Sequence, residues 1–143
     1  MHEHATAHQR MTLAATEMIL ISDAVLPAVN AEFRYHCEDP FAVQMLLSVD
    51  QSPPISWVFG RELLINGVCM PSGIGDVQVY PTHDGVVIEL RSGGTTAALL
   101  AHTPDVMDFT DRTLQLVPLG TEMEHYGLED DLSLLQVPDS FEA

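Results

Sequence analysis

The sequence of 143 residues contains no lysine, so five arginines are its only strong cations. They stand against 21 aspartates and glutamates, which gives a formal net charge of −16 at pH 7. Such a charge repels nucleic acid at long range, and there is no basic cluster from which counter-ion release could drive binding. The same shortage argues against an anionic membrane surface. We therefore expect neither nucleic acid nor lipid headgroups as partners.

Cysteines are few, and long apolar runs are absent. Cys37 and Cys69 are too few and too far apart for a disulfide framework or a C-x-x-C site, so we expect two reduced thiols in or near the core. No apolar run approaches the roughly 18 residues that a bilayer requires. The first ten residues also lack the pattern of a signal peptide. We therefore expect a cytoplasmic protein without membrane insertion, and the length favours one domain.

Alternating and apolar segments predict seven strands. The clearest pattern lies in residues 41–49, where an apolar residue recurs at every second position, as in a half-buried strand. Turn signals at Asp84-Gly85 and Gly93-Gly94 predict two hairpins. The expected strands cover residues 13–25, 32–35, 41–49, 55–59, 76–80, 86–91 and 95–102.

Helical signals are concentrated in the C-terminal part. Thr103 is a suitable N-cap before Pro104 and Asp105, and apolar residues then recur at helical spacing to about Leu116. A shorter helix is expected over 128–136. A helical turn at 61–65 should end at Asn66-Gly67, because glycine tolerates the left-handed backbone of a helix end. The predicted fold class is α+β, a mostly antiparallel sheet of about seven strands with C-terminal helices.

Three separated segments carry a recognisable pattern. In the block 57–81, a strand containing Trp57 runs into the turn that begins with Arg61, and a bend with Gly73 and Gly75 leads through Asp76 into the next strand. The other two segments are Tyr35 with Asp39-Pro40-Phe41-Ala42-Val43, and Phe109, Arg112-Thr113 and Val117-Pro118-Leu119-Gly120-Thr121-Glu122. Through these segments the chain resembles the SsgA-like family of sporulation and cell-division proteins of actinomycetes. The resemblance covers residues 13–136.

The resemblance implies a non-enzymatic adaptor of sporulation-linked cell division. Such a protein would help to position or promote septum assembly by the tubulin-like GTPase FtsZ and septal wall remodelling, without a cofactor. It also implies a compact domain similar to the whirly-type fold, a homo-oligomer that is a trimer, and recruitment to division septa through proteins such as FtsZ or its regulators. The expected organisation is a flexible tail at 1–12, one domain at 13–136 and a C-terminal tail at 137–143.

One group of residues is a candidate contact surface for a partner. Asp105, Asp108 and Asp111 recur at every third position of the predicted helix and form an acidic edge. This acidic edge is either a solvated helix face or a docking surface for a basic patch on a partner.

The remaining motif residues are expected to have structural roles. Trp57 should lie in the core or at a subunit interface. Arg61 and Arg112 should each find a carboxylate, because arginines are scarce among so many acids. We place Tyr35, Asp39, Pro40, Gly67, Gly73, Gly75 and Asp76 in the same structural group.

Reactive and metal-binding patterns are weak. Gly73-Ile74-Gly75 is followed by a strand, so it lacks the helix N-terminus that a phosphate loop needs. His2, His4 and His8 have a spacing that allows a metal, but no predicted structure there would hold a metal geometry, so we expect a mobile tail. Strand alternation should place His36 and Cys37 on opposite faces. No catalytic, cofactor or metal residue is assigned. The alternatives to an adaptor are a single-stranded nucleic-acid-binding module, which the charge opposes, and a small metal-binding protein or enzyme.

Overall fold

The computed structural model describes residues 10–21, 28–50 and 52–126, which form one antiparallel sheet and three helices. The strand order in the sheet is β4-β3-β2-β1-β7-β6-β5. The strands are β1 (Met11–Ile21), β2 (Ala28–His36), β3 (Ala42–Ser48), β4 (Ile55–Gly60), β5 (Val77–Pro81), β6 (Val86–Ser92) and β7 (Thr95–Ala101). The helices are α2 (Arg61–Gly67), α3 (Thr103–Leu116) and α4 (Glu122–His125).

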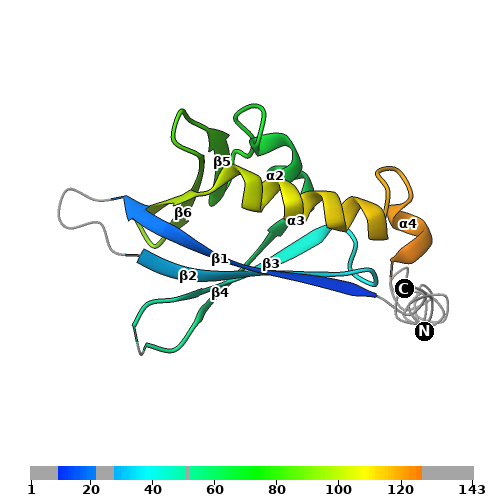
Figure 1. Ribbon diagram of the computed structural model, residues 1–143, viewed down its shortest axis with the longest axis horizontal. Coiled ribbons are helices and arrows are strands. Elements are labelled where there is room, and N and C mark those ends of the chain that lie inside the picture. The colour runs from blue at the N-terminus through cyan, green and yellow to red at the C-terminus, as the bar shows by residue number, and fades with distance from the viewer. Residues whose placement is uncertain (1–9, 22–27, 51, 127–143) are drawn as a thin grey trace, which may run out of the picture.

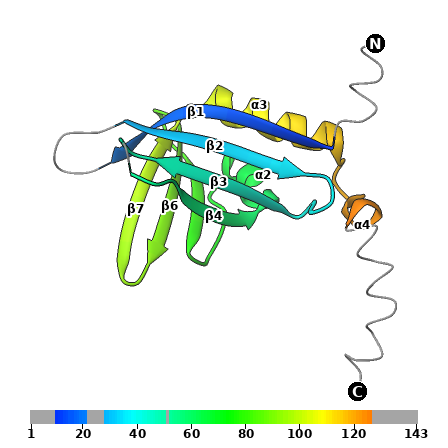
Figure 2. The ribbon, with the colours of Figure 1, turned by 90° about the horizontal axis from the view of Figure 1, so that it is seen from below.

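The sheet curls around the two longer helices. Strands β1 to β4 run side by side, while β6 and β7 turn across their direction (Figure 2). Helix α3 packs along β1, and α2 contacts both α3 and β5 (Figure 1). The core therefore lies between one face of the sheet and these helices.

Alternating side chains of the central strands fill this core. Phe33 and Tyr35 of β2 are fully buried, as the sequence pattern predicts. On α3, Val106 and Phe109 are fully buried, which confirms the predicted helical spacing. The rings of Phe33 and Phe109 stack with their centroids 5.1 Å apart, and this contact joins the helix to the sheet.

The predicted α+β class and the seven strands are confirmed, whereas several boundaries differ. Strand β2 begins at Ala28, although we expected its start at residue 32. Val29 and Ala31 are buried and extend the alternation, and residues 28–30 pair with β1. Phe41 is exposed and precedes β3; its ring meets Tyr126 edge-on at 5.9 Å. Pro81 belongs to β5, where it is tolerated because β5 is an edge strand.

Helix α3 spans the predicted residues, but its cap differs. His102 occupies the N-cap position, and no side chain caps the helix, so the prediction for Thr103 was wrong; Thr103 is the first helical residue. The short helix α4 was not predicted. The helix expected at 128–136, the C-terminal tail 137–143 and residues 1–9 lie outside the described residues. No described helix is long and apolar enough to cross a bilayer.

Candidate functional site

The three motif segments of the sequence meet at Arg61. This residue starts α2 directly after β4, and its backbone N–H donates a hydrogen bond of 2.7 Å to the carbonyl of Phe41. Its side chain is only 2% exposed. The guanidinium lies over the ring of Tyr35, with its central carbon 5.2 Å from the ring centroid. The Tyr35 hydroxyl donates in turn to the carbonyl of Pro40.

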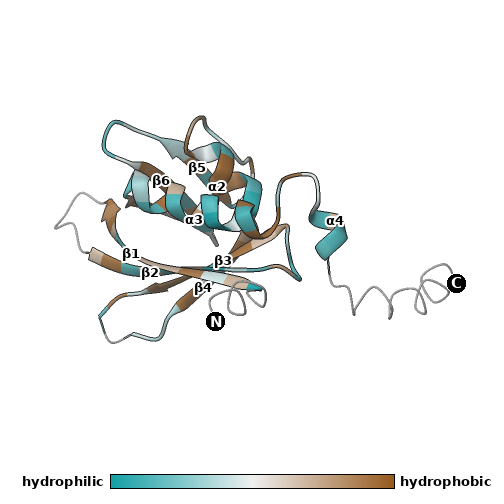
Figure 3. Ribbon diagram, turned by 45° about the vertical axis from the view of Figure 1, so that its right-hand side comes forward, coloured by the Kyte–Doolittle hydropathy of each residue, from teal (hydrophilic) through white to brown (hydrophobic). Residues whose placement is uncertain are grey.

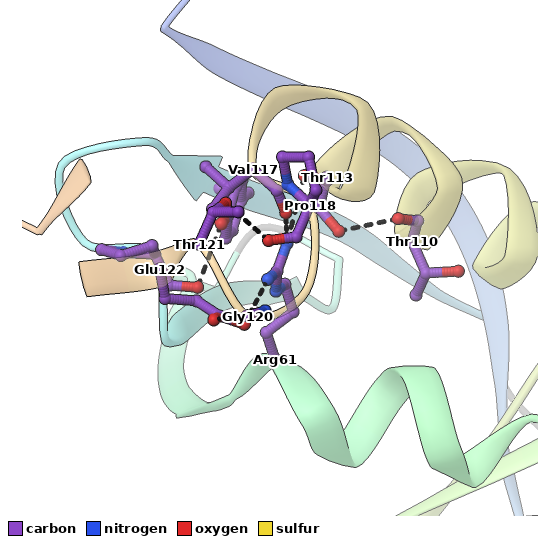
Figure 4. Close-up of polar contacts among 10 residues, drawn as sticks. Arg61, Thr110, Thr113, Val117, Pro118, Gly120, Thr121 and Glu122 are labelled. Carbon is purple, nitrogen blue, oxygen red and sulfur yellow. Dashed lines mark hydrogen bonds and ion pairs between the residues drawn. The ribbon is translucent and has the colours of Figure 1, made fainter. Parts of the chain in front are cut away.

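The guanidinium of Arg61 also holds the C-terminal end of α3. Nη1 donates to the carbonyls of Thr113 at 3.1 Å and Val117 at 2.7 Å, and Nη2 donates to Oε2 of Glu122 at 2.8 Å (Figure 4). The last carbonyls of a helix have no partner within the helix, so a cation placed there satisfies them and complements the helix dipole. Arg61 therefore ties β4 and α2 to the end of α3 and to α4.

Hydrogen bonds hold the carboxylate of Glu122 in its charged form. The pKa of Glu122 is lowered, chiefly by the backbone N–H of Glu122 itself and further by the Arg61 side chain and the N–H of Gly120; burial opposes these effects. Burial also raises the pKa of Tyr35 to about 12, against the opposing charge of Arg61. Both groups are thus fixed in one protonation state at neutral pH, which suits a structural cluster better than acid–base chemistry.

Arg112 forms a second, more exposed junction. Its Nη2 lies 3.2 Å from Asp108 one turn earlier, and Nη1 donates to Thr12 Oγ1 and to the carbonyl of Leu13. Its Nε is buried without a hydrogen-bond partner among the described residues. The expectation that Arg61 and Arg112 find carboxylates is confirmed, and Arg112 joins α3 to β1.

The acidic edge is exposed, but its three carboxylates are not equivalent. Asp105 accepts a hydrogen bond of 2.6 Å from Thr16 Oγ1, and Asp108 pairs with Arg112. Asp111 has no such contact among the described residues. Only Asp111 is therefore a fully available charge for a partner.

The three motif glycines differ in what a side chain at each position would meet. Helix α2 ends at Gly67, as predicted, but Gly67 is buried and lacks the left-handed backbone that we expected there. A Cβ at Gly67 would lie 2.2 Å from Cγ1 of Val79, so glycine here lets α2 approach β5. Gly73 has φ +98°, and a Cβ there would lie 2.5 Å from the carbonyl of Val77. A Cβ at Gly75 would meet nothing within 4 Å.

Trp57 is half-buried at the sheet edge rather than deep in the core. It packs against the core from β4 and, together with Asp76, lines two adjoining hollows. One, of about 480 Å³, lies between β4 and the bend 73–76. The other, of about 640 Å³, extends to the turn between β6 and β7. Trp57 and Asp76 therefore border a surface groove, which the sequence did not reveal.

The reactive candidates do not converge. His36 is exposed and Cys37 is buried, so they face opposite sides, and burial raises the pKa of the Cys37 thiol. Cys69 is exposed, contrary to the expected core position. Asp39 is an exposed turn residue whose carbonyl accepts from the N–H of Ala42. Among residues 10–21, 28–50 and 52–126 no group of His, Cys, Asp and Glu could hold a metal ion, and His2, His4 and His8 lie outside these ranges.

Sequence reasoning missed the role of Glu122 and the convergence on Arg61. Glu122 belongs to a recognised motif, but 61 positions separate it from its partner. A lone acid near a helix end gives no signal of such a distant contact. The available signal was the scarcity of arginine, from which a carboxylate partner for Arg61 was expected without saying which one.

The geometry defines a small α+β domain whose motif residues stabilise a junction between elements. The model of the family described as "Streptomyces sporulation and cell division protein, SsgA" matches residues 29–122. The chain is 38% identical over 120 residues to the sporulation-specific cell division protein SsgB of Streptomyces coelicolor, covering 81% of this chain and 87% of that protein. It is 34% identical over 133 residues to SsgB of Saccharopolyspora erythraea, covering 90% and 94%.

Solved structures agree with this match. The crystal structure of an SsgA-like sporulation-specific cell division protein from Thermobifida fusca superimposes with a TM-score of 0.80 at 30% identity, covering 86% of this chain and 93% of that one. This chain belongs to the SsgA-like family of sporulation and cell-division proteins.

Proposed function

We propose that this protein is a non-enzymatic adaptor of sporulation-linked cell division. It helps to position or promote septum assembly by FtsZ and the accompanying remodelling of the septal wall. Membership of a family of sporulation and cell-division proteins carries this proposal.

The described residues support an adaptor rather than an enzyme. The most deeply buried charged cluster, around Arg61 and Glu122, has its polar groups occupied by one another and by backbone carbonyls. At its surface, the described part of the chain has an acidic edge on α3 and exposed apolar side chains at one edge of the sheet. Such surfaces serve recognition, since charge complementarity and exposed apolar groups favour protein contacts.

The proposal includes assembly and location. The protein acts in the cytoplasm as a homotrimer that is recruited to division septa. Light scattering across a dilution series tests the trimer, because a mass near 15.7 kDa at all concentrations would contradict it.

The adaptor role is tested in an actinomycete strain that lacks its own copy of the gene. The wild-type chain should restore sporulation septa, and a fluorescent fusion should gather at them. Purified protein should change the amount of FtsZ that sediments as polymer with GTP. The His36→Ala and Cys37→Ser variants should restore septa and change FtsZ sedimentation as the wild-type chain does, because neither residue has an assigned chemistry. A septation defect in folded His36→Ala protein would instead favour an enzyme.

A further inference from the structure

The two edges of the sheet differ in their protection against another strand. At one edge, Val79 of β5 exchanges both backbone hydrogen bonds with Ser72, and Pro81 has no N–H to offer. At the other edge, β4 pairs with β3 alone among the described residues. Its sequence, ISWVFG, has no charge and no proline, the usual means of protecting an edge. The β4 edge is therefore open to strand addition.

Apolar side chains surround this open edge. Ile55 and Val58 of β4 are 56% and 62% exposed, and the hydropathy colouring shows apolar segments along β4 (Figure 3). Across the hollow beside Trp57, the bend 73–76 presents Ile74, which is 99% exposed. An added strand would place alternate side chains toward this hollow, where Phe59 and Leu63 also lie.

The charge of the protein indicates the kind of strand that fits. All five arginines lie within 4.0 Å of a carboxylate of the same chain; the pairs are Arg10–Glu38, Arg34–Glu32, Arg61–Glu122, Arg91–Glu89 and Arg112–Asp108. The net charge of −16 thus arises from carboxylates without a cation of their own. A second copy brings the same charge and no spare cation. A basic partner segment is attracted instead.

We propose that the β4 edge and the hollow beside Trp57 bind an extended segment of a partner protein in which apolar and basic residues alternate. The backbone of the segment pairs with β4, and its apolar side chains enter the hollow that Asp76 borders. Its basic side chains point to the opposite side of the added strand and are attracted by the net negative charge of the protein. The inference rests on the proposed function only in that the protein works by binding other proteins.

The test uses purified full-length protein and a synthetic probe, a fluorescein-labelled nine-residue peptide of alternating arginine and valine. Binding should appear in fluorescence anisotropy, and in nuclear magnetic resonance spectra the shifted amides should lie in β4 and in the bend 73–76. A probe with glutamate in place of arginine should not bind. A probe with methylated backbone nitrogens should bind at least about tenfold more weakly, because it cannot donate to β4.

Two protein variants make the test specific. Val58→Lys should weaken the arginine–valine probe at least about tenfold, because a lysine protects an edge and repels the probe. Leu13→Lys adds the same charge at an exposed apolar position of β1, on the same sheet face, and should leave binding unchanged. Equal binding of the methylated probe, equal loss in both variants, or shifts confined to α3 would overturn the proposal.

A second copy on β4 is a further outcome. If Val58→Lys lowers the mass in light scattering and the β4 amides of wild-type protein are already protected from exchange, the edge is an interface between copies and the proposal is wrong. The proposed function fails on a different observation, namely normal septation in the strain that lacks the protein. The probe experiment does not depend on that strain.

Discussion

At the scale of single residues, the buried guanidinium of Arg61 is the most consequential group of the described residues. It contacts an aromatic ring, two helix carbonyls and the carboxylate of Glu122. A buried charge is tolerated only when such partners replace water. The same partners make the residue irreplaceable by a shorter or neutral side chain.

Arg61→Ala should therefore destabilise the fold strongly. It removes the donor of the Val117 carbonyl and of Glu122 Oε2, and one of the two donors of the Thr113 carbonyl. We expect a loss of about 3–5 kcal/mol in the free energy of unfolding. Urea denaturation measures this loss. Arg91→Ala is the control, because Arg91 is exposed and 4.0 Å from Glu89, and should cost less than about 1 kcal/mol. Similar losses in both variants would contradict a structural role for Arg61.

Glu122 should make stability depend on acidity. Its pKa is lowered in the folded protein, so the unfolded chain takes up the proton first as the pH falls. Its contribution is complete above its ordinary pKa of 4.5 and is lost as the pH falls through the lower folded value. Urea unfolding should show a smaller difference between wild type and Glu122→Gln at about pH 3.5 than at about pH 7. A constant difference would contradict the shift.

Two glycines provide a matched pair. Gly67→Ala should cost about 1–3 kcal/mol, because the new methyl group would overlap Val79 and force α2 away from β5. Gly75→Ala has open space and no left-handed backbone, and should be neutral or stabilising by up to about 1 kcal/mol. Thermal unfolding of both variants checks this, and the reverse order would contradict the packing argument.

At the scale of elements, periodicity predicted most of the described structure. The alternation of β3 and the helical spacing of α3 are local signals, since each residue's burial follows from its own position. The start of β2 was missed because Ala28 to Asn30 look like a turn until β1 lies beside them. The partnership of Arg61 with Glu122 and the groove at Trp57 arise from tertiary contacts that no local pattern encodes.

The acidic edge of α3 leads to a prediction at this scale. Asp111→Lys should reduce partner recruitment to septa and leave stability within about 0.5 kcal/mol, because Asp111 is exposed and its side chain has no hydrogen bond or ion pair with another described residue. Septum counts in the complemented strain and circular dichroism measure the two effects. Asp84→Lys, also exposed but in the turn between β5 and β6, is the charge-matched control. Equal septation in both variants would place the docking surface elsewhere.

At the scale of the whole molecule, the surface is nearly free of available positive charge. Every arginine is engaged by a carboxylate of its own chain. The electrostatic field of the molecule therefore attracts basic partners and repels phosphate backbones.

The protein should not bind single-stranded DNA or RNA. Non-specific binding derives mainly from cations that neutralise phosphates, and none is spare here. Anisotropy of labelled oligonucleotides at about 150 mM salt should stay unchanged on addition of protein. Micromolar binding that weakens with salt would show that arginines from several copies converge, and would favour the nucleic-acid alternative.

Because only one of its two edges is open, the sheet can accept one added strand. Because Ser72 and Pro81 protect β5, a segment that occupies β4 leaves no second open edge among the described strands. Pairing through β4 consequently stops after one partner and cannot propagate into a fibre. If β4 binds a partner segment as proposed, each copy ends the row of paired strands and does not extend it.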